Sequence, residues 1–352
     1  MEKEKNNRSS FSGKIGFVLS AAGASVGLGN IWRFPYLAAK YGGGIFLLIY
    51  ILLALTFGYT MIVAESALGR MTRKSPVGAF KAFGKKAGWL SFGGWINAII
   101  PVLIVPYYSV IGGWVIKYFV EYLKGNGAKL AEDGYFSNFI SNGLSTEICF
   151  IVFCMFTLII IYAGVRNGIE RVSKFMMPIL VVLSVIIAIY SVTRPGALAG
   201  VKYFLVPNPK NFSWMTVVTA MGQMFYSLSI AMGILVTFGS YMKKDTSIED
   251  STRNVEVFDT AIAIMAGLMI MPAVFACSCC DPDTLQAGPS LMFITIPKVF
   301  DSMGFGTFAG ILFFLLVLFA AVTSSIALTE SAVSTVEDEL KWSRKKSTVI
   351  VG

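Results

Sequence analysis

The sequence predicts an all-α integral membrane protein, and its composition and its uncharged segments both support this class. Hydrophobic residues make up 55% of the 352 residues and charged residues 14%, and the mean hydropathy is +0.70, far from globular usage. A helix needs about 20 residues to cross a bilayer. Uncharged stretches long enough to do so predict eight spans, at residues 15–32, 41–64, 87–116, 148–165, 175–193, 211–242, 260–280 and 302–329.

The basic residues predict the orientation of these spans. With residues 1–14 in the cytoplasm, the Lys and Arg clusters within 70–86, 166–174, 243–253 and 341–346 also fall on the cytoplasmic side. The net charge of +9 is then explained by topology and by attraction to anionic lipid, and it requires no nucleic-acid partner. We expect a multi-pass protein of the cell (inner) membrane with a cytoplasmic N-terminus that is not a cleaved signal.

The first span is interrupted by Gly23-Ala24-Ser25-Val26-Gly27-Leu28-Gly29-Asn30-Ile31-Trp32-Arg33-Phe34-Pro35. Such a segment does not form one uninterrupted helix. Irregular backbone at membrane depth is tolerated only where it lines a cavity or binds something, so the segment indicates a binding site. It closely resembles the first-helix signature of the neurotransmitter:sodium symporters, a family of sodium-coupled transporters of amino acids and amines.

The absence of histidine and the few cysteines narrow the chemistry of the chain. The chain has no histidine, which excludes Ser-His-Asp and Cys-His nucleophiles and an imidazole zinc site. Glu65 is expected to be the one remaining buried acid, in a structural role that the family resemblance assigns to it: bonding the broken backbone of the sixth helix. Cys277, Cys279 and Cys280 permit a soft-metal site or a disulfide, although filling of a helix end is the favoured interpretation. We therefore expect no enzyme and no cofactor besides sodium.

The sixth span contains residues 222–233, which resemble the second discontinuous helix of the family, with Ala231 where many members have glycine. Interrupted first and sixth spans would occupy corresponding positions in two repeats of opposite topology. The expected fold is thus an inverted five-helix-repeat transporter fold with discontinuous helices 1 and 6. Residues 1–200 would form the first repeat, helices 1–5. Residues 201–352 would form an incomplete second repeat, helices 6–8 and the start of helix 9, so that the chain is apparently truncated after the eighth helix.

The loop 281–301 would be broken at Gly288-Pro289 and Ile296-Pro297 and could re-enter or cap a vestibule.

The eighth span contains Phe319-Ala320-Ala321-Val322-Thr323-Ser324-Ser325, again similar to the family. Hydroxyls in a helix usually bond to their own carbonyls, but the resemblance implies two sodium ions here. One sodium would lie among the carbonyls of Gly23, Val26 and Ala320 and the hydroxyls of Thr323 and Ser324. The other would use Ser25, Asn30, Ser227 and Asp259.

Asp259 differs from the asparagine that other members of the family have. An aspartate in the membrane is expensive unless it is paired, so we treat it as functional; the alternative is that it ends its helix near the cytosolic loop. In chloride-dependent relatives, positions matching Tyr50, Gln223 and Ser227 would hold an anion. We expect Asp259 to supply that negative charge, which would make transport chloride-independent and would allow a proton to return outward.

Gly27 stands where amine-transporting relatives carry an aspartate, so the substrate is expected to bring its own carboxylate. The amide groups of Leu28 and Gly29 and the hydroxyl of Tyr108 would bind that carboxylate. A neutral hydrophobic or aromatic amino acid fits the mostly apolar residues that the resemblance implies. The expected substrate-binding residues are Ala24, Ser25, Leu28, Gly29, Ile104, Tyr108, Tyr226, Ser227, Ser229, Met232, Ser324 and Leu328.

The resemblance also implies two gates. Arg33 and Tyr226 would close the site from outside, and Arg8, Tyr241 and Asp338 from inside. Gly168 and Pro178 resemble a motif that lets the fifth helix unwind. The predicted function is sodium-coupled symport by alternating access. The alternatives are a non-transporting amino-acid binding protein or sensor, an inactive fragment and, least favoured, a membrane enzyme.

Overall fold

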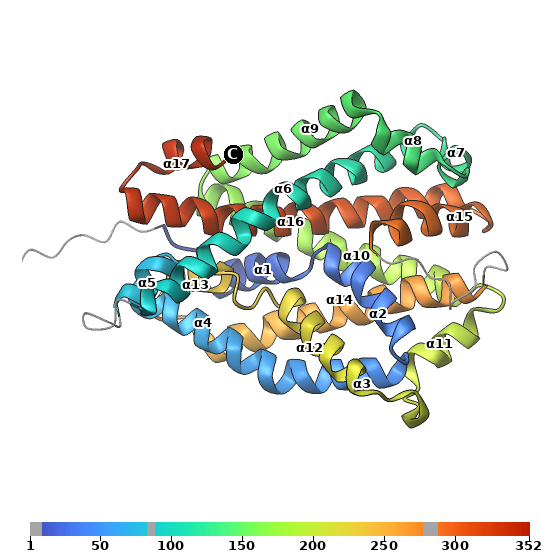
Figure 1. Cartoon of the computed structure of the whole chain (residues 1–352), viewed down its shortest axis with the longest axis horizontal. Helices are drawn as coiled ribbons and strands as arrows, with labels where there is room; N and C mark the ends of the chain where they lie inside the picture. The colour runs from blue at the N-terminus through green and yellow to red at the C-terminus, as the bar shows by residue number, and fades with distance from the viewer. Residues whose placement is uncertain (1–8, 83–88, 277–287) are drawn as a thin grey trace, which may run out of the picture.

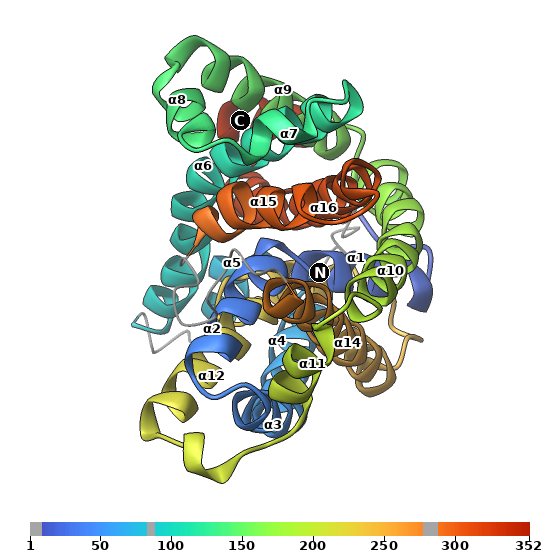
Figure 2. The same ribbon diagram turned by 90° about the vertical axis from the view of Figure 1, so that its right-hand side faces the viewer.

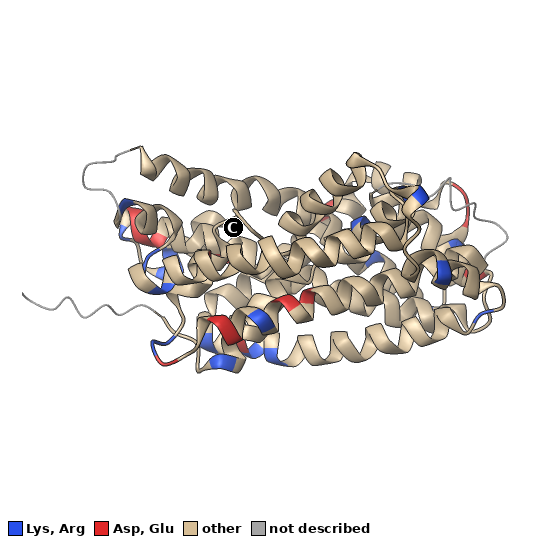
Figure 3. Cartoon of the chain, turned by 90° about the horizontal axis from the view of Figure 1, so that it is seen from below, with Lys and Arg blue, Asp and Glu red and all other residues tan. Residues whose placement is uncertain are grey.

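The computed structural model describes residues 9–82, 89–276 and 288–352, and these residues are almost entirely helical. Within these ranges the β structure is limited to one isolated bridge between Gly43 and Pro207. The long helices run side by side along the longest axis of the molecule (Figure 1). Most charged residues lie toward the two ends of this bundle, and few lie between them (Figure 3). This distribution is that of a bundle that crosses a membrane.

Six unbroken helical spans are long and apolar enough to cross a membrane. They are Gly44–Thr72 (α3 Gly44–Leu53, a π-helical turn Ala54–Gly58 and α4 Tyr59–Thr72), α6 Leu90–Leu123, α9 Gly143–Tyr162, Val165–Val192 (a π-helical turn Val165–Glu170 and α10 Arg171–Val192), α14 Ile248–Ala276 and α16 Gly306–Leu340. Shorter helices connect them: α5 Pro76–Ala82, α7 Gly127–Ala131, α8 Tyr135–Ser141, α11 Ala197–Leu205, a 3-10 turn Pro209–Asn211, α15 Ile296–Asp301 and α17 Arg344–Val351.

The first span is broken, as predicted. Helix α1, Lys14–Ser25, ends where Val26 becomes extended, and a π-helical turn, Gly29–Arg33, leads into α2, Phe34–Lys40. The two halves are bent by 52°. With this pair counted as one span, the described residues contain seven spans.

The sixth predicted span, 211–242, is two short helices, α12 Trp214–Ser227 and α13 Ile234–Ser240, neither of which is long enough to cross alone. Between them Ser229, Ala231 and Gly233 all have positive φ, at 55°, 60° and 69°. The left-handed region costs about 1–2 kcal/mol for an L-residue, so Ala231 needs support. Glu65 supplies it, because its Oε1 accepts a hydrogen bond from the Ala231 N–H at 2.8 Å. The predicted structural role of Glu65 is confirmed.

Several predicted boundaries are wrong because charged residues were taken to end the spans. Helix α14 begins 12 residues before the predicted residue 260 and includes Asp259, which is fully buried. Helix α16 continues to Leu340, past the predicted 329. Glu65 is not the only other buried acid, since Glu121, Glu170, Glu256 and Glu330 are buried as well.

The predicted break at Ile296-Pro297 is wrong as well. A π-helical turn, Leu291–Thr295, continues directly into α15, and Pro297 lies in the first turn of that helix. The predicted Cys277, Cys279 and Cys280 cluster lies outside the described residues, as does Arg8. Along the described ranges, no other group of three His, Cys, Asp or Glu side chains is placed to hold a metal.

Helix α16 forms the centre of the bundle. It lies between α6 and α9 on one side and α1 and α10 on the other (Figure 2). The residues of its middle, from Ala320 to Thr335, are all buried. The broken α1–α2 segment therefore faces the hydroxyl-rich turn of α16 across the centre of the molecule.

Candidate functional site

A cavity lies at the centre of the bundle, where the breaks of the first and sixth helices meet α6 and α16. Its volume is about 30 Å³. All twelve residues that were predicted to bind the substrate line it, together with Gly27 and Asn30. The lining residues are Ala24, Ser25, Gly27, Leu28, Gly29, Asn30, Ile104, Tyr108, Tyr226, Ser227, Ser229, Met232, Ser324 and Leu328.

One end of the cavity is polar and narrow. The Leu28 N–H, exposed where the first helix resumes, donates a hydrogen bond to the Tyr108 hydroxyl at 3.2 Å. A Cβ placed on Gly27 would lie 2.6 Å from Ser324 Oγ and 2.9 Å from the Tyr108 hydroxyl. The site therefore excludes an aspartate at position 27, and it offers N–H and O–H donors in its place. Such donors at a helix N-terminus suit a carboxylate.

A second polar cluster surrounds Asp259, beside the break of the first helix. The Asn30 side-chain amide donates to Asp259 Oδ1 at 2.8 Å and to Ser227 Oγ at 2.9 Å. Ser227 Oγ lies 2.8 and 2.9 Å from the two carboxylate oxygens, and the Tyr50 hydroxyl donates to Oδ2 at 2.9 Å. All these side chains are buried. The structure thus places Asp259 mid-helix among Asn30 and Ser227, and the alternative that it merely ends its helix is wrong.

The charge of Asp259 is not balanced by any residue of the described chain. Its hydrogen-bond partners are neutral, and no Lys or Arg forms an ion pair with it among residues 9–82, 89–276 and 288–352. A buried, unpaired carboxylate is costly, so the cluster favours a bound cation. Ser25, the remaining predicted member, directs its hydroxyl to the Ala21 carbonyl at 3.1 Å, which leaves its own carbonyl as its candidate ligand atom.

A third cluster gathers around the Ser324 hydroxyl of α16. Its Oγ lies 3.2 Å from each of three carbonyl oxygens of the first helix, those of Gly23, Ala24 and Val26. One hydroxyl proton serves one carbonyl well, so this group of oxygens holds more acceptors than donors. Thr323 Oγ1 lies 2.9 Å from the Phe319 carbonyl and 3.2 Å from that of Ala320. An oxygen-rich, donor-poor group of this kind suits a hard cation.

Tyr50, Gln223 and Ser227 match positions that would hold an anion in chloride-dependent relatives, but here these side chains have other partners. The Tyr50 hydroxyl is already bonded to Asp259, and Gln223 Nε2 donates to the Gly29 carbonyl at 3.1 Å. Gln223 Oε1 is buried with no partner among the described residues. The Asp259 carboxylate therefore takes the hydroxyls of Tyr50 and Ser227, whereas Gln223 is bonded to the first helix.

The two residues expected to form an outer gate lie against each other. The Arg33 guanidinium is 5.2 Å from the centre of the Tyr226 ring, a cation–π distance. The same ring covers Gly29, where a Cβ would lie 2.4 Å from Tyr226 Cε1. Arg33, a costly residue in lipid, thus packs on Tyr226, which lines the cavity.

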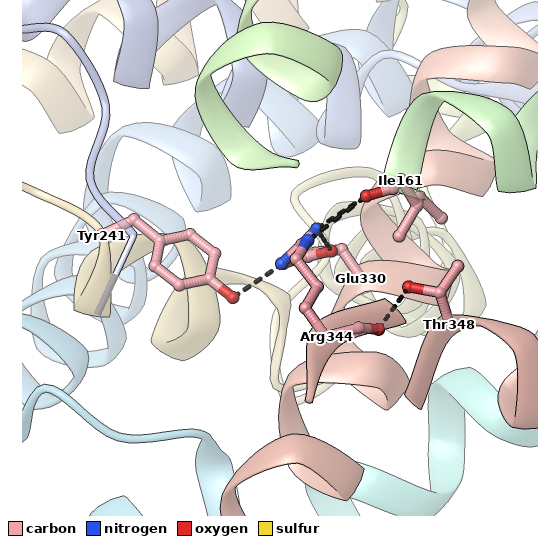
Figure 4. A network of polar contacts seen from close by, with 5 residues as sticks. All are labelled: Ile161, Tyr241, Glu330, Arg344 and Thr348. Atoms are coloured by element: carbon pink, nitrogen blue, oxygen red, sulfur yellow. Dashed lines mark hydrogen bonds and ion pairs between the residues drawn. The ribbon is translucent and has the colours of Figure 1, made fainter. Parts of the chain in front are cut away.

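The inner residues form a network that the sequence did not predict. The Tyr241 hydroxyl donates to Glu330 Oε1 at 2.7 Å, and Arg344 pairs with both oxygens of Glu330 at 2.9 and 2.6 Å (Figure 4). Arg344 also donates two hydrogen bonds to the Ile161 carbonyl, at 3.2 and 3.1 Å. Asp338, the expected gate acid, accepts a hydrogen bond from the Ser75 N–H at 2.5 Å. Sequence reasoning could have identified Glu330 in the same way as Asp259, because both are acidic residues inside an apolar helix.

The fifth span begins with a second inner anchor. Gly168 lies in the π-helical turn, where a Cβ would be 1.9 Å from the Ile160 carbonyl, and α10 continues through Pro178 unbroken. Glu170, at the end of that turn, accepts the Ser12 N–H at 2.8 Å and pairs with Lys174 at 2.6 Å. The N-terminal segment is thereby fixed to the turn predicted to unwind.

Comparison with known proteins gives one consistent result. The model of the sodium:neurotransmitter symporter family matches residues 8–130 and 137–352. The uncharacterized sodium-dependent transporter YhdH of Bacillus subtilis is 37% identical over 96% of this chain and 74% of its own length. The sodium- and chloride-dependent glycine transporter 2 of Xenopus laevis is 29% identical over 96% of this chain and 52% of its own. The crystal structure of MhsT in complex with L-phenylalanine matches with a TM-score of 0.88 and 36% identity, over 98% of this chain and 78% of that one.

Proposed function

The chain belongs to the sodium:neurotransmitter symporter family, and we propose that it is a sodium-coupled symporter of a neutral hydrophobic or aromatic amino acid. The observation that carries the proposal is the central cavity, which combines a donor-rich end for a carboxylate with apolar walls. Ile104, Met232 and Leu328 supply these walls. MhsT, whose structure is similar to this one, was crystallised with L-phenylalanine, which fits the same class of substrate.

Two sodium ions would accompany each substrate. One would bind at Asp259 with Asn30, Ser227 and the Ser25 carbonyl, where a buried negative charge has no cation partner in the part of the chain that the structure describes. The other would bind at Ser324 with Thr323 and the carbonyls of Gly23, Val26 and Ala320. At about 2.3 kcal/mol per charge per 100 mV, two inward ions supply several kcal/mol for accumulation before any concentration gradient is counted.

Transport would proceed by alternating access. Arg33 and Tyr226 would close the outer side and Arg8, Tyr241 and Asp338 the inner side. The broken helices would rock against the rest of the bundle, with residues 1–200 and 201–352 as two inverted repeats. The N-terminus would be cytoplasmic, in a cell membrane. Asp259 would make chloride unnecessary, because it supplies the negative charge beside the first sodium.

The first experiment is binding of radiolabelled phenylalanine, leucine, glycine, lysine and γ-aminobutyrate to the purified chain in sodium chloride, sodium gluconate and potassium chloride. We expect binding of phenylalanine or leucine in both sodium salts and none in potassium. Binding that requires chloride would overturn the role of Asp259, and binding of lysine or γ-aminobutyrate would overturn the substrate class.

A matched pair of variants tests the cavity. Gly27→Ala adds a methyl group between Ser324 and Tyr108 and should abolish binding. Gly222→Ala adds the same group to α12 at a position with no atom within 4 Å, and it should bind as the parent does. Equal binding by the two variants would remove the cavity from the proposal.

Uptake separates the symporter from the alternative of a binding protein or sensor. In proteoliposomes, we expect an inward sodium gradient to drive accumulation of the bound amino acid. Sodium-dependent binding without uptake would favour the alternative.

A further inference from the structure

A groove runs along the outside of the bundle between α10 and α16, far from the central cavity. It lies at the end opposite the N-terminal segment, where α10 ends and α16 begins (Figure 1). Its volume is about 320 Å³. The described residues that line it are Ile186, Ile187, Tyr190, Arg194, Phe305, Phe308, Ala309 and Leu312.

The two walls of the groove are fixed to each other. The Tyr190 hydroxyl of α10 donates a hydrogen bond to the Gly304 carbonyl, just before α16. The next residue, Phe305, has a φ of +62° and is 86% exposed, although it is neither glycine nor polar. The left-handed backbone turns its ring outward beside the groove, and Phe308, 60% exposed, lies one turn further along. Both helices are long and apolar enough to cross a membrane, and the two rings are exposed on the outside of the bundle.

One charged side chain stands at the rim of this apolar groove. Arg194 follows the last turn of α10, where its Nε donates to the Tyr190 carbonyl at 3.2 Å and its guanidinium lies 4.4 Å from the Tyr190 ring centre. Within the part of the chain that the structure describes, the terminal nitrogens of Arg194 make no other hydrogen bond or ion pair. The lining includes no carboxylate. These contacts fix the position of the guanidinium, and the N–H groups of its terminal nitrogens are available to an anion.

We propose that this groove binds an anionic phospholipid, with its phosphate on Arg194 and an acyl chain along Ile186, Phe308 and Leu312. A guanidinium matches a phosphate in geometry and charge. An arginine at the end of a spanning helix reaches the headgroup level while its stem stays in the apolar region. A free phosphate would use only the rim, and a zwitterionic lipid would bring an ammonium group for which the lining has no carboxylate.

Photolabelling tests the site on the full chain in nanodiscs. The probe is phosphatidylglycerol with a diazirine in one acyl chain, and adducts are mapped by mass spectrometry. We expect adducts on the peptides that contain Phe308 or Leu312, and competition by unlabelled phosphatidylglycerol but not by phosphatidylcholine. Arg194→Gln should lower this labelling at least fivefold. Arg171→Gln, which removes an exposed arginine near the other end of the same helix, should leave it unchanged.

The contrary outcomes are distinct. Equal labelling of the two variants, or equal competition by phosphatidylcholine, would overturn the role of Arg194. Loss of labelling in a dimer crosslinked through this face would assign the groove to a second copy of the chain. Phe308→Ala offers a second check that does not alter charge, and it should weaken labelling while amino-acid binding at the central cavity stays normal. Failure of the proposed transport function would leave these results untouched, because they require neither sodium nor amino acid.

Discussion

Asp259 and Glu330 are both carboxylates with no exposed surface, yet their surroundings differ in one respect. Asp259, at the middle of the bundle, is bonded only to neutral groups, those of Asn30, Ser227 and Tyr50. Glu330, toward the end that holds the N-terminal segment, is bonded to the Arg344 guanidinium through both oxygens. Among the described residues, the first carboxylate has no Lys or Arg partner, and the second has one.

This difference separates two uses of a buried charge. A carboxylate that has its own arginine is neutralised permanently and ties together the elements that supply the pair. A carboxylate surrounded by neutral donors is held in place without being neutralised, so a mobile cation gains the full interaction when it arrives. The comparison predicts that removal of the Arg344 cation lowers the stability of the protein. It predicts that removal of the Asp259 charge leaves stability the same or raises it.

The largest effect is expected from Arg344→Met. This change leaves Glu330 buried without a cation, and breaking a buried pair in this way costs about 3–5 kcal/mol. Thermal unfolding of the purified protein should show a large loss of stability, whereas Arg171→Met, at an exposed position, should show none. The double variant Glu330→Gln with Arg344→Met should recover part of the loss. If the single variant unfolds like the parent, the pair does not hold the inner end together.

Asp259→Asn should act in the opposite way. In potassium salts its stability should equal or exceed that of the parent, because an uncompensated buried charge is removed. Sodium affinity in sodium gluconate should fall at least tenfold, which corresponds to about 1.4 kcal/mol, and chloride should restore much of it. Binding of the labelled amino acid across a sodium titration measures both effects. Asp250→Asn, in the exposed first turn of the same helix, is the control, and a chloride-insensitive Asp259→Asn would contradict the charge argument.

A smaller effect is expected at the site without a carboxylate. Ser324→Ala removes one neutral oxygen ligand, worth about 0.5–1.5 kcal/mol, so the sodium titration should shift by roughly twofold to tenfold. The neighbouring Ser325→Ala should cause no shift, since the Ser325 Oγ accepts a hydrogen bond from the Thr157 hydroxyl of α9 at 3.5 Å. If Ser324→Ala matches the loss caused by Asp259→Asn, the two sites do not differ in the way that their charges suggest.

The two acids also show how far the sequence alone leads. The break at Gly23 to Gly29 and the importance of Asp259 could be predicted, because glycines and an acid in an apolar segment are local signals. The support of Ala231 by Glu65 was accessible only through the family resemblance. The pair of Glu330 with Arg344 was missed, because Arg344 belongs to the helix that follows α16 and the contact forms only when α17 folds back. Partner choice of this kind depends on tertiary packing.

The smallest effect is expected where water can replace the partner. Asp133 pairs with Lys298 at 2.5 Å, but its side chain is 92% exposed, and exposed pairs contribute little because solvent screens them. Lys298 holds the pKa of Asp133 below its usual range, so the pair contributes above the unfolded-state pKa and is lost as the pH falls through the folded-state pKa. Lys298→Met should leave the unfolding temperature at pH 7 unchanged within error. The variant should lack only the slight stabilisation that the parent gains from the pair and loses in acid. A drop comparable to that of Arg344→Met would show that burial does not set the cost of removing a carboxylate's cation.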